Sequence, residues 1–263
     1  MENTTMENTR TKTTRNSLIL LLTAAIWGMA FVSQSKGMDY MHPFTFNGVR
    51  SLIGAASILV YILISRKIAG DKAAPLDWKL NVKAGLLCGI FLTIASTLQQ
   101  FGIKYTSVGK AGFITTLYII FVPMFGIFLK KKVAPVVWAA AVMAAVGMYL
   151  LCMTESLRLG AGDIMVFLCA IAFAIQIMTV DHYAARIDGA VVSCIQFTVC
   201  GVVCCIGALI WGQPTFGQLQ EGLGALLYAG VLSCGVGYTL QIVGQKGLNP
   251  TCLLYTSDAA DEL

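Results

Sequence analysis

One arginine stands inside an otherwise apolar stretch of the sequence. Arg50 lies seven residues after Pro43, in the run Phe44–Ser65. Charged side chains are costly inside a bilayer and tend to face the interior of a helix bundle. Two roles are open for Arg50. It binds a substrate carboxylate or a polar neighbour inside the bundle, or it reaches back to the lipid headgroups as an anchor.

Glutamines recur in four of the apolar runs. They are Gln99, Gln176, Gln196 and Gln241. An amide both donates and accepts hydrogen bonds, so such side chains suit a zwitterionic or otherwise polar substrate. The alternative role is hydrogen bonding between helices, which is worth only about 0.6–2 kcal/mol. Gln99 and Gln241 occupy equivalent places in a repeated pattern, and we therefore expect both to face one central cavity.

Three aromatic residues, Trp27, Tyr118 and Tyr238, could form a wall of the same cavity. Trp27 and Tyr118 fall in the middle of apolar runs, where an interfacial anchor is not expected. Packing in the apolar core is the alternative for all three residues. The adjacent pair Asp181-His182 follows Gln176 and could relay a proton in a coupled carrier, or simply form a solvated helix end.

The composition identifies a membrane protein. Apolar residues make up 57% of the chain and charged residues 12%, with a mean hydropathy of +0.76. Soluble domains have nearer to ~50% and ~25%. The nine cysteines and two histidines form no motif at metal-binding spacing. We therefore expect no metal, no cofactor, no catalytic residue and no nucleic-acid partner.

The apolar runs predict eight transmembrane helices and no strand. The expected spans are Ser17–Ser35, Phe44–Ser65, Ala84–Gly102, Val108–Leu129, Pro135–Met153, Asp163–Tyr183, Ala190–Trp211 and Leu223–Val243. With the N-terminus in the cytoplasm, 13 of the 18 Lys and Arg residues fall on the cytoplasmic side. Only Lys36, Lys104 and Arg158 fall outside, and basic residues concentrate on the cytoplasmic side of membrane proteins.

An internal repeat indicates how these helices are organised. The pattern Leu-Gln-x-x-Gly-x-Lys begins at Leu98 and returns 142 residues later at Leu240, each time at the end of an apolar helix. We expect a cytoplasmic tail over residues 1–16, disordered, and a first unit of five helices over 17–153. An incomplete second unit of three helices follows over 160–251. Because five is odd, the second unit is inverted relative to the first.

The end of the sequence breaks the repeat. Residues 252–263 are acidic, lack helical periodicity and resemble the translation of a transposase sequencing adapter. We interpret them as adapter-derived or as a disordered tail. The two helices that would complete the second unit are then missing, and we expect the chain as written not to transport.

Three stretches of the first unit carry a resemblance to a known family. They are Ala25-Ile26-Trp27-Gly28, the segment from Pro43 to Arg50, and Tyr105-Thr106-Ser107-Val108-Gly109-Lys110-Ala111. Together they resemble the EamA-type transporters of the drug/metabolite transporter superfamily. The family often has Gly-Glu after its fourth helix, whereas this chain has Lys130-Lys131-Lys132.

The resemblance implies an all-α, polytopic bundle built from an inverted 5+5 repeat, of which eight helices are present. It implies a secondary transporter, an exporter of small metabolites such as amino acids, in the bacterial inner membrane. The partners expected are a small-molecule substrate and the lipid bilayer. Proton coupling and a homodimer are left open. The alternatives are a membrane receptor or scaffold that does not transport and a membrane-embedded enzyme, which would need a cluster of intramembrane His or carboxylate residues.

Overall fold

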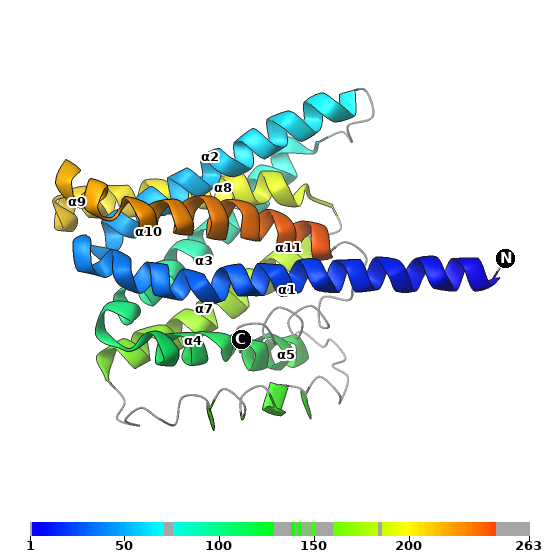
Figure 1. The fold of residues 1–263 in the computed structure, drawn as a ribbon, viewed down its shortest axis with the longest axis horizontal. Coiled ribbons are helices and arrows are strands. Elements are labelled where there is room, and N and C mark those ends of the chain that lie inside the picture. Colours follow the sequence, from blue (N-terminus) through cyan, green and yellow to red (C-terminus); the bar gives the residue numbers. More distant parts are fainter. Residues whose placement is uncertain are drawn as a thin grey trace.

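The computed structural model describes residues 2–70, 76–128, 160–183 and 186–245, with isolated positions between 138 and 150. All regular elements of these residues are helices (Figure 1), so the all-helical prediction is confirmed. In chain order they are α1 (Glu2–Tyr40), α2 (Pro43–Ala69), α3 (Trp78–Tyr105), α4 (Val108–Thr116), α5 (Tyr118–Phe128), α7 (Ala161–Tyr183), α8 (Gly189–Gly207), η2 (Ala208–Gly212), α9 (Phe216–Glu221), α10 (Leu223–Leu227), η3 (Tyr228–Gly237) and α11 (Tyr238–Gln245).

These helices supply seven candidate membrane spans in the described residues. The spans are Thr14–Tyr40, Pro43–Ala69, Trp78–Tyr105, Val108–Ile127, Ala161–Tyr183, Gly189–Gly212 and Leu223–Gln241. Each corresponds to one predicted helix. The remaining prediction, Pro135–Met153, falls largely outside the described residues. The proposed tail over 252–263 lies outside them entirely.

The N-terminal segment corrects one prediction. Helix α1 begins at Glu2, and its first turns project beyond the bundle (Figure 1), where the sequence predicted a disordered tail over residues 1–16. Extending an existing helix costs far less than nucleating a new one, because each added residue gains a hydrogen bond. Met6, Glu7, Arg10 and Lys12 also have good intrinsic helix propensity.

Side-chain caps fix where several helices begin. The carboxylates of Asp77 and Asp188 accept backbone N–H groups in the first turns of α3 and α8. Ser107 caps α4 in the same way, by accepting from the N–H of Lys110. These side chains satisfy backbone donors that have no partner within the helix. They lie in the short connections that the apolar runs predicted.

Two spans depart from a regular α-helix. The fourth breaks at Leu117 between α4 and α5, two turns before Pro123. Proline lacks a donor and its ring collides with the carbonyl four residues earlier, so the helix bends on its N-terminal side. The last span contains the π-helical segment η3, ten residues long. Such wide turns concentrate at functional sites.

The helices contact one another in a pattern that matches an inverted repeat. Helix α2 packs along α8, and α3 packs along both α7 and α8. In the other half, η3 packs along α2 and, with α11, along α1. Thus α3, the third span of the first unit, contacts the first and second spans of the second unit. In the same way the third span of the second unit, which contains η3 and α11, contacts the first and second spans of the first unit. The two units therefore meet through equivalent helices.

Small residues allow the closest of these contacts. A Cβ atom on Gly102 of α3 would lie 2.4 Å from Cγ2 of Val166 on α7. One on Gly162 of α7 would lie 2.8 Å from the carbonyl oxygen of Gly102. Only glycine lets the two backbones approach to this distance.

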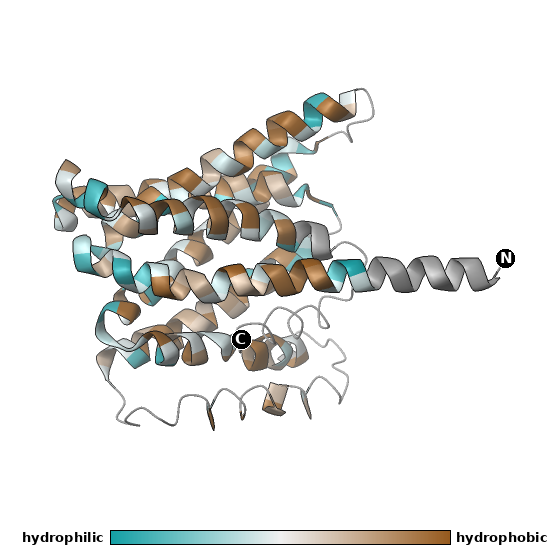
Figure 2. Ribbon diagram, in the orientation of Figure 1, coloured by the Kyte–Doolittle hydropathy of each residue, from teal (hydrophilic) through white to brown (hydrophobic). Residues whose placement is uncertain are grey.

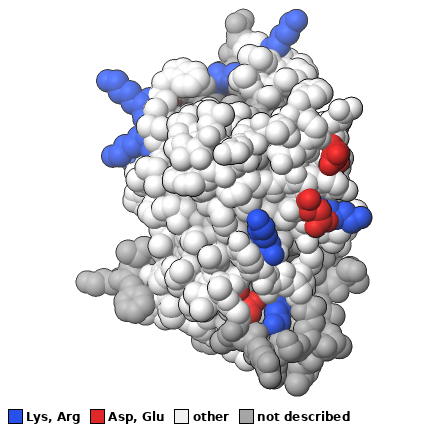
Figure 3. Space-filling model, turned by 90° about the vertical axis from the view of Figure 1, so that its left-hand side faces the viewer, with Lys and Arg blue, Asp and Glu red and all other residues white. Residues whose placement is uncertain are grey.

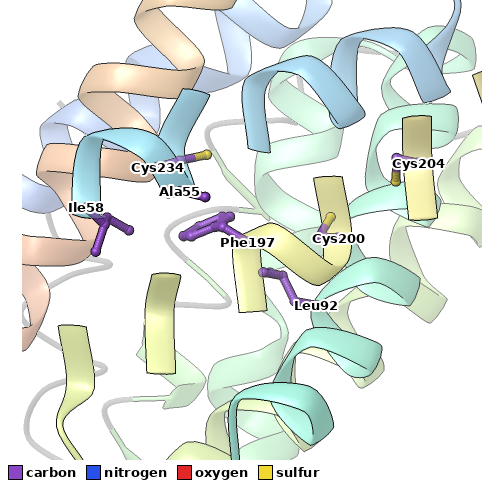
Figure 4. Close-up of a cluster of buried hydrophobic side chains, with 7 residues drawn as sticks. All are labelled: Ala55, Ile58, Leu92, Phe197, Cys200, Cys204 and Cys234. Carbon is purple, nitrogen blue, oxygen red and sulfur yellow. The ribbon is translucent and has the colours of Figure 1, made fainter. Parts of the chain in front are cut away.

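The outer surface of the bundle is apolar, as a bilayer requires. Large side chains such as Leu63, Met29 and Ile164 are 61%, 63% and 58% exposed, and the helices are brown along most of their length in Figure 2. Seen from the end that contains α9, the charged side chains are few, and some acidic and basic side chains lie next to each other (Figure 3). Inside, α2, α3, α8 and η3 share a core cluster (Figure 4). It comprises Ala55, Ile58, Leu92, Phe197, Cys200, Cys204 and Cys234.

Candidate functional site

Arg50 lies deeper in its span than other charged residues do. It is about 10 Å along α2 from Pro43, at 1.5 Å per residue. The other charged side chains of the described spans lie within about one and a half turns of a span end. Arg50 is only 6% exposed. Moving an arginine to the centre of a transmembrane helix costs about 2.5–3.5 kcal/mol on insertion scales. Polar or charged partners are therefore needed to stabilise the buried side chain.

A polar cluster holds one end of the Arg50 side chain. Its Nε donates to Oδ1 of Asn47, at 3.0 Å, one turn earlier on α2. The Asn47 amide donates in turn to Oγ of Ser96, at 3.0 Å, and to Sγ of Cys204, at 3.2 Å. Asn47 is completely buried. Side chains from α2, α3 and α8 therefore orient the guanidinium group.

The terminal nitrogens of Arg50 are left for another partner. They form no hydrogen bond or ion pair with the part of the chain that the structure describes, and neither is fully enclosed by protein atoms. Phe46 lies beneath the guanidinium carbon, 5.7 Å from the ring centroid. The guanidinium group is also within electrostatic range of Cys169, Cys200 and Tyr238.

Three aromatic rings form a wall near Arg50. The rings of Trp27 and Tyr238 have centroids 5.1 Å apart, and Phe197 meets Tyr238 edge-on at 4.7 Å. The indole N–H of Trp27 donates to the carbonyl oxygen of Ser233 in η3, which fixes the ring. Tyr238 lies deep among protein atoms yet keeps part of its surface accessible. We call Trp27, Arg50, Phe197 and Tyr238 the central site.

The predicted glutamines take different positions. Gln176 donates to Gln196 at 3.0 Å, which joins α7 to α8 directly before Phe197 and one turn before Cys200. Gln99 is buried and donates to Thr115 of α4 at 3.3 Å. Gln241 is half-buried one turn after Tyr238, and no described hydrogen bond joins it to Gln99.

The remaining predicted site residues lie away from the central site. Tyr118 begins α5 and is half-buried. Asp181 and His182 lie in the last turn of α7, where His182 is exposed and packs edge-on against Tyr183. The described residues hold no group of three His, Cys, Asp or Glu side chains that could bind a metal ion.

Two groups of residues were not predicted from the sequence. Phe197 belongs to the central site, and Asn47 supports its Arg50. Only the i, i+3 spacing of Asn47 and Arg50 could have indicated the contact between those two residues. A second polar group lies near one end of the bundle. Asp163, only 3% exposed, pairs with Lys110 at 3.8 Å and accepts from the hydroxyl of Thr106 and the N–H of Gly160. It ties the connection between α3 and α4 to α7.

Comparisons with known proteins identify the family of this chain. The model of the EamA-like transporter family matches residues 15–153 and 160–254. An uncharacterized transporter of Archaeoglobus fulgidus is 31% identical over 171 residues, which are 63% of this chain and 48% of that relative. This chain therefore matches about half of that relative's length. The uncharacterized transporter YwfM of Bacillus subtilis is 26% identical over 251 residues, which are 94% of this chain and 82% of YwfM.

A solved crystal structure shows the same fold. It superposes with a TM-score of 0.71 at 17% sequence identity, covering 95% of this chain and 85% of the other. The family match extends over both helical units and most of the chain. With its apolar spans and its repeated unit, the chain belongs to the EamA-like transporter family.

Proposed function

We propose that this transporter is a secondary carrier that exports small polar or amphipathic metabolites by alternating access. One observation carries the proposal: the central site is built from both repeat units. Trp27 and Arg50 come from the first unit, and Phe197 and Tyr238 come from the second. A substrate bound there would contact both units, so a rocking motion of one against the other would change which side it faces.

The burial of Arg50 supports a role inside the bundle. A side chain that reached the lipid headgroups would be exposed on the outer surface, whereas Arg50 is enclosed by α2, α3 and α8. We place Gln176 and Gln196 beside the central site as further polar contacts. Gln99, Tyr118 and Gln241 belong to the same proposed cavity in other states of the cycle.

The location and energetics of transport are part of the proposal. We place the protein in the bacterial inner membrane with its N-terminus in the cytoplasm, because basic residues concentrate at one set of loops. Asp181 and His182 would lie at the cytoplasmic end of α7, where a proton could enter a coupled carrier.

A transport assay in cells tests the proposal. The complete gene is expressed in a host deficient in metabolite export, and efflux of a metabolite panel is measured together with membrane abundance. We expect efflux of at least one small metabolite, and a larger loss of efflux than of abundance in Arg50→Ala. Arg66→Ala is the matched control, since Arg66 lies on the same helix and forms an exposed ion pair with Asp188. A chain that inserts normally but moves no metabolite would instead be a receptor or scaffold.

A further inference from the structure

The charge of Arg50 lacks a counterion in the described part of the chain. Its described polar contacts are with a neutral amide, Asn47, and with the face of Phe46. The ion pairs of the described residues are Arg66–Asp188 and Lys110–Asp163, both near helix ends. An uncompensated cation of this kind is costly unless a bound anion supplies the missing charge and hydrogen bonds.

The free end of the guanidinium group has the geometry that a carboxylate needs. Asn47 occupies Nε, which leaves the two terminal nitrogens to donate as a parallel pair. Arginine and a carboxylate form bidentate hydrogen bonds of this kind, which are stronger than neutral ones. The polar cluster of Asn47, Ser96 and Cys204 already holds the group in place, so little further ordering is required on binding.

The surroundings of Arg50 define the rest of the ligand. Trp27 and Tyr238 present partly exposed aromatic rings beside the charge, with the buried ring of Phe197 packed behind Tyr238, and none of the three adds a formal charge. A ligand with an apolar or aromatic body would bury that body against these rings. A ligand carrying only a positive charge would be repelled by Arg50, since no described carboxylate lies in the central site to offset it.

We propose that the central site binds the anionic head group of its substrate. The substrate is a small carboxylate whose apolar body packs against Trp27 and Tyr238, and whose carboxylate binds the terminal nitrogens of Arg50. This assignment rests on the proposed carrier function, because it names the substrate class of the same site. It separates this chain from carriers whose substrates are organic cations.

Matched compounds test the head group directly. The protein expressed from the complete gene is reconstituted in liposomes, and counterflow is measured for compounds that share one phenyl-alkyl body but carry a carboxylate, a carboxamide or an ammonium group. We expect the carboxylate to be preferred over both by about tenfold or more, as hydrogen bonds between charged groups exceed those to neutral ones. A preference for the ammonium or the carboxamide compound, or no preference, would overturn the assignment.

Two variants assign that preference to Arg50. Arg50→Gln should reduce the preference to nearly equal use of carboxylate and carboxamide, whereas Arg50→Lys should retain most of it. Arg66→Gln should match the parent. If Arg50→Gln does not fold, the assignment rests on the selectivity of the parent and of Arg50→Lys, and loss of the carboxylate preference in a folded Arg50→Lys would overturn it. Unchanged selectivity in a folded Arg50→Gln would overturn the assignment.

A binding measurement separates this inference from transport itself. Tryptophan fluorescence of the detergent-solubilised protein is titrated with the same three compounds, with Trp27→Phe as the variant that removes the reporter in the central site. Carboxylate-specific quenching that depends on Trp27, without counterflow, would support the anion site and contradict the carrier function. Counterflow without discrimination between head groups would support the carrier function and contradict the anion site.

Discussion

At the scale of single residues, the buried amide of Asn47 holds the guanidinium group of Arg50 in place. Arg50 was identifiable because a charge inside an apolar run is rare. Its partner Asn47 was not predicted, although its i, i+3 spacing from Arg50 is a local sign of their contact. The contacts of Asn47 with Ser96 and Cys204 bring together residues 49 and 157 positions apart. Such contacts depend on how the helices pack, which local patterns do not determine.

Asn47→Ala should weaken both the fold and the selectivity for a carboxylate. It leaves Nε of Arg50 without its acceptor and removes the donor to Ser96, for a loss of about 1–3 kcal/mol in stability. Asn81→Ala is the control, because Asn81 is equally buried and bonds the backbone of Asp77 and Asp188 away from the central site. Thermal unfolding in detergent and counterflow selectivity are the measurements. Equal losses of selectivity in both variants would contradict a specific role for Asn47.

His42 should make the start of α2 sensitive to pH. Its Nδ1 accepts from the N–H of Phe44, and burial, followed by the charge of Lys104, lowers the pKa of His42 from the ordinary 6.5. Because the pKa of His42 is lower in the folded protein, the unfolded chain binds the proton at a higher pH than the folded chain does. The cap therefore contributes its full stability above about pH 6.5, and this contribution falls as pH decreases toward the folded-state pKa.

The expected size of this effect is that of a helix cap, about 0.5–2 kcal/mol. Thermal unfolding between pH 5 and 8 should show a decline below about pH 6.5 in the parent that is reduced in His42→Asn, which keeps an acceptor but does not titrate. An identical pH profile in both proteins would show that His42 is not the cause.

At the scale of elements, span positions followed from hydropathy, whereas irregular geometry did not. Seven of the predicted helices have counterparts among the described spans. The π-helical η3 could not be predicted, because it arises where one helix adapts to the surface of its neighbours, whereas the break at Leu117 lies on the N-terminal side of Pro123. η3 supplies the carbonyl of Ser233 that fixes Trp27, so this irregularity shapes the central site.

The contact between α3 and α7 should tolerate no added side-chain volume. Gly102→Ala would place a methyl group 2.4 Å from Val166 and 3.0 Å from the carbonyl oxygen of Gly162, and we expect a loss of about 1–3 kcal/mol. Gly112→Ala on α4 is the control, since nothing lies within 4 Å of its Cβ position, and it should be neutral or stabilising. Thermal unfolding of the two variants decides the matter. A neutral Gly102→Ala would contradict the close packing.

Asp163 should anchor the connection between α3 and α4. Asp163→Ala removes the acceptor of Thr106, Gly160 and Lys110, and should cost about 1.5–3 kcal/mol. Asp39→Ala, at an exposed carboxylate near the same end of the bundle, should change stability by less than about 0.5 kcal/mol. Equal melting temperatures for the two variants would exclude the anchor.

At the scale of the whole molecule, duplication made the architecture predictable. A repeated pattern and an odd number of helices per unit implied inversion, and the observed contacts pair equivalent helices of the two units. The residues that make up the central site were harder to predict from the sequence. Gln99 and Gln241 occupy equivalent repeat positions, yet Gln99 is buried and bonds Thr115 whereas Gln241 is half-buried, because equivalent sequence positions meet different neighbours.

Topology can be tested with introduced thiols. Gln220 lies in α9, and Gln220→Cys should react with a membrane-impermeant reagent added to intact cells, whereas Lys79→Cys at the start of α3 should not. The unmodified chain gives the baseline of native thiols. The reverse labelling pattern would place the N-terminus outside.

The central claim is that a site between the two repeat units opens in turn to both sides of the membrane. The most direct measurement is labelling of Tyr238→Cys by an impermeant thiol reagent in right-side-out and inside-out vesicles, with the lipid-facing Ile164→Cys as control. We predict that Tyr238→Cys reacts above the parent baseline from both sides, while Ile164→Cys reacts from neither. Labelling of Tyr238→Cys from one side only, or no more than that of Ile164→Cys, would contradict alternating access at this site.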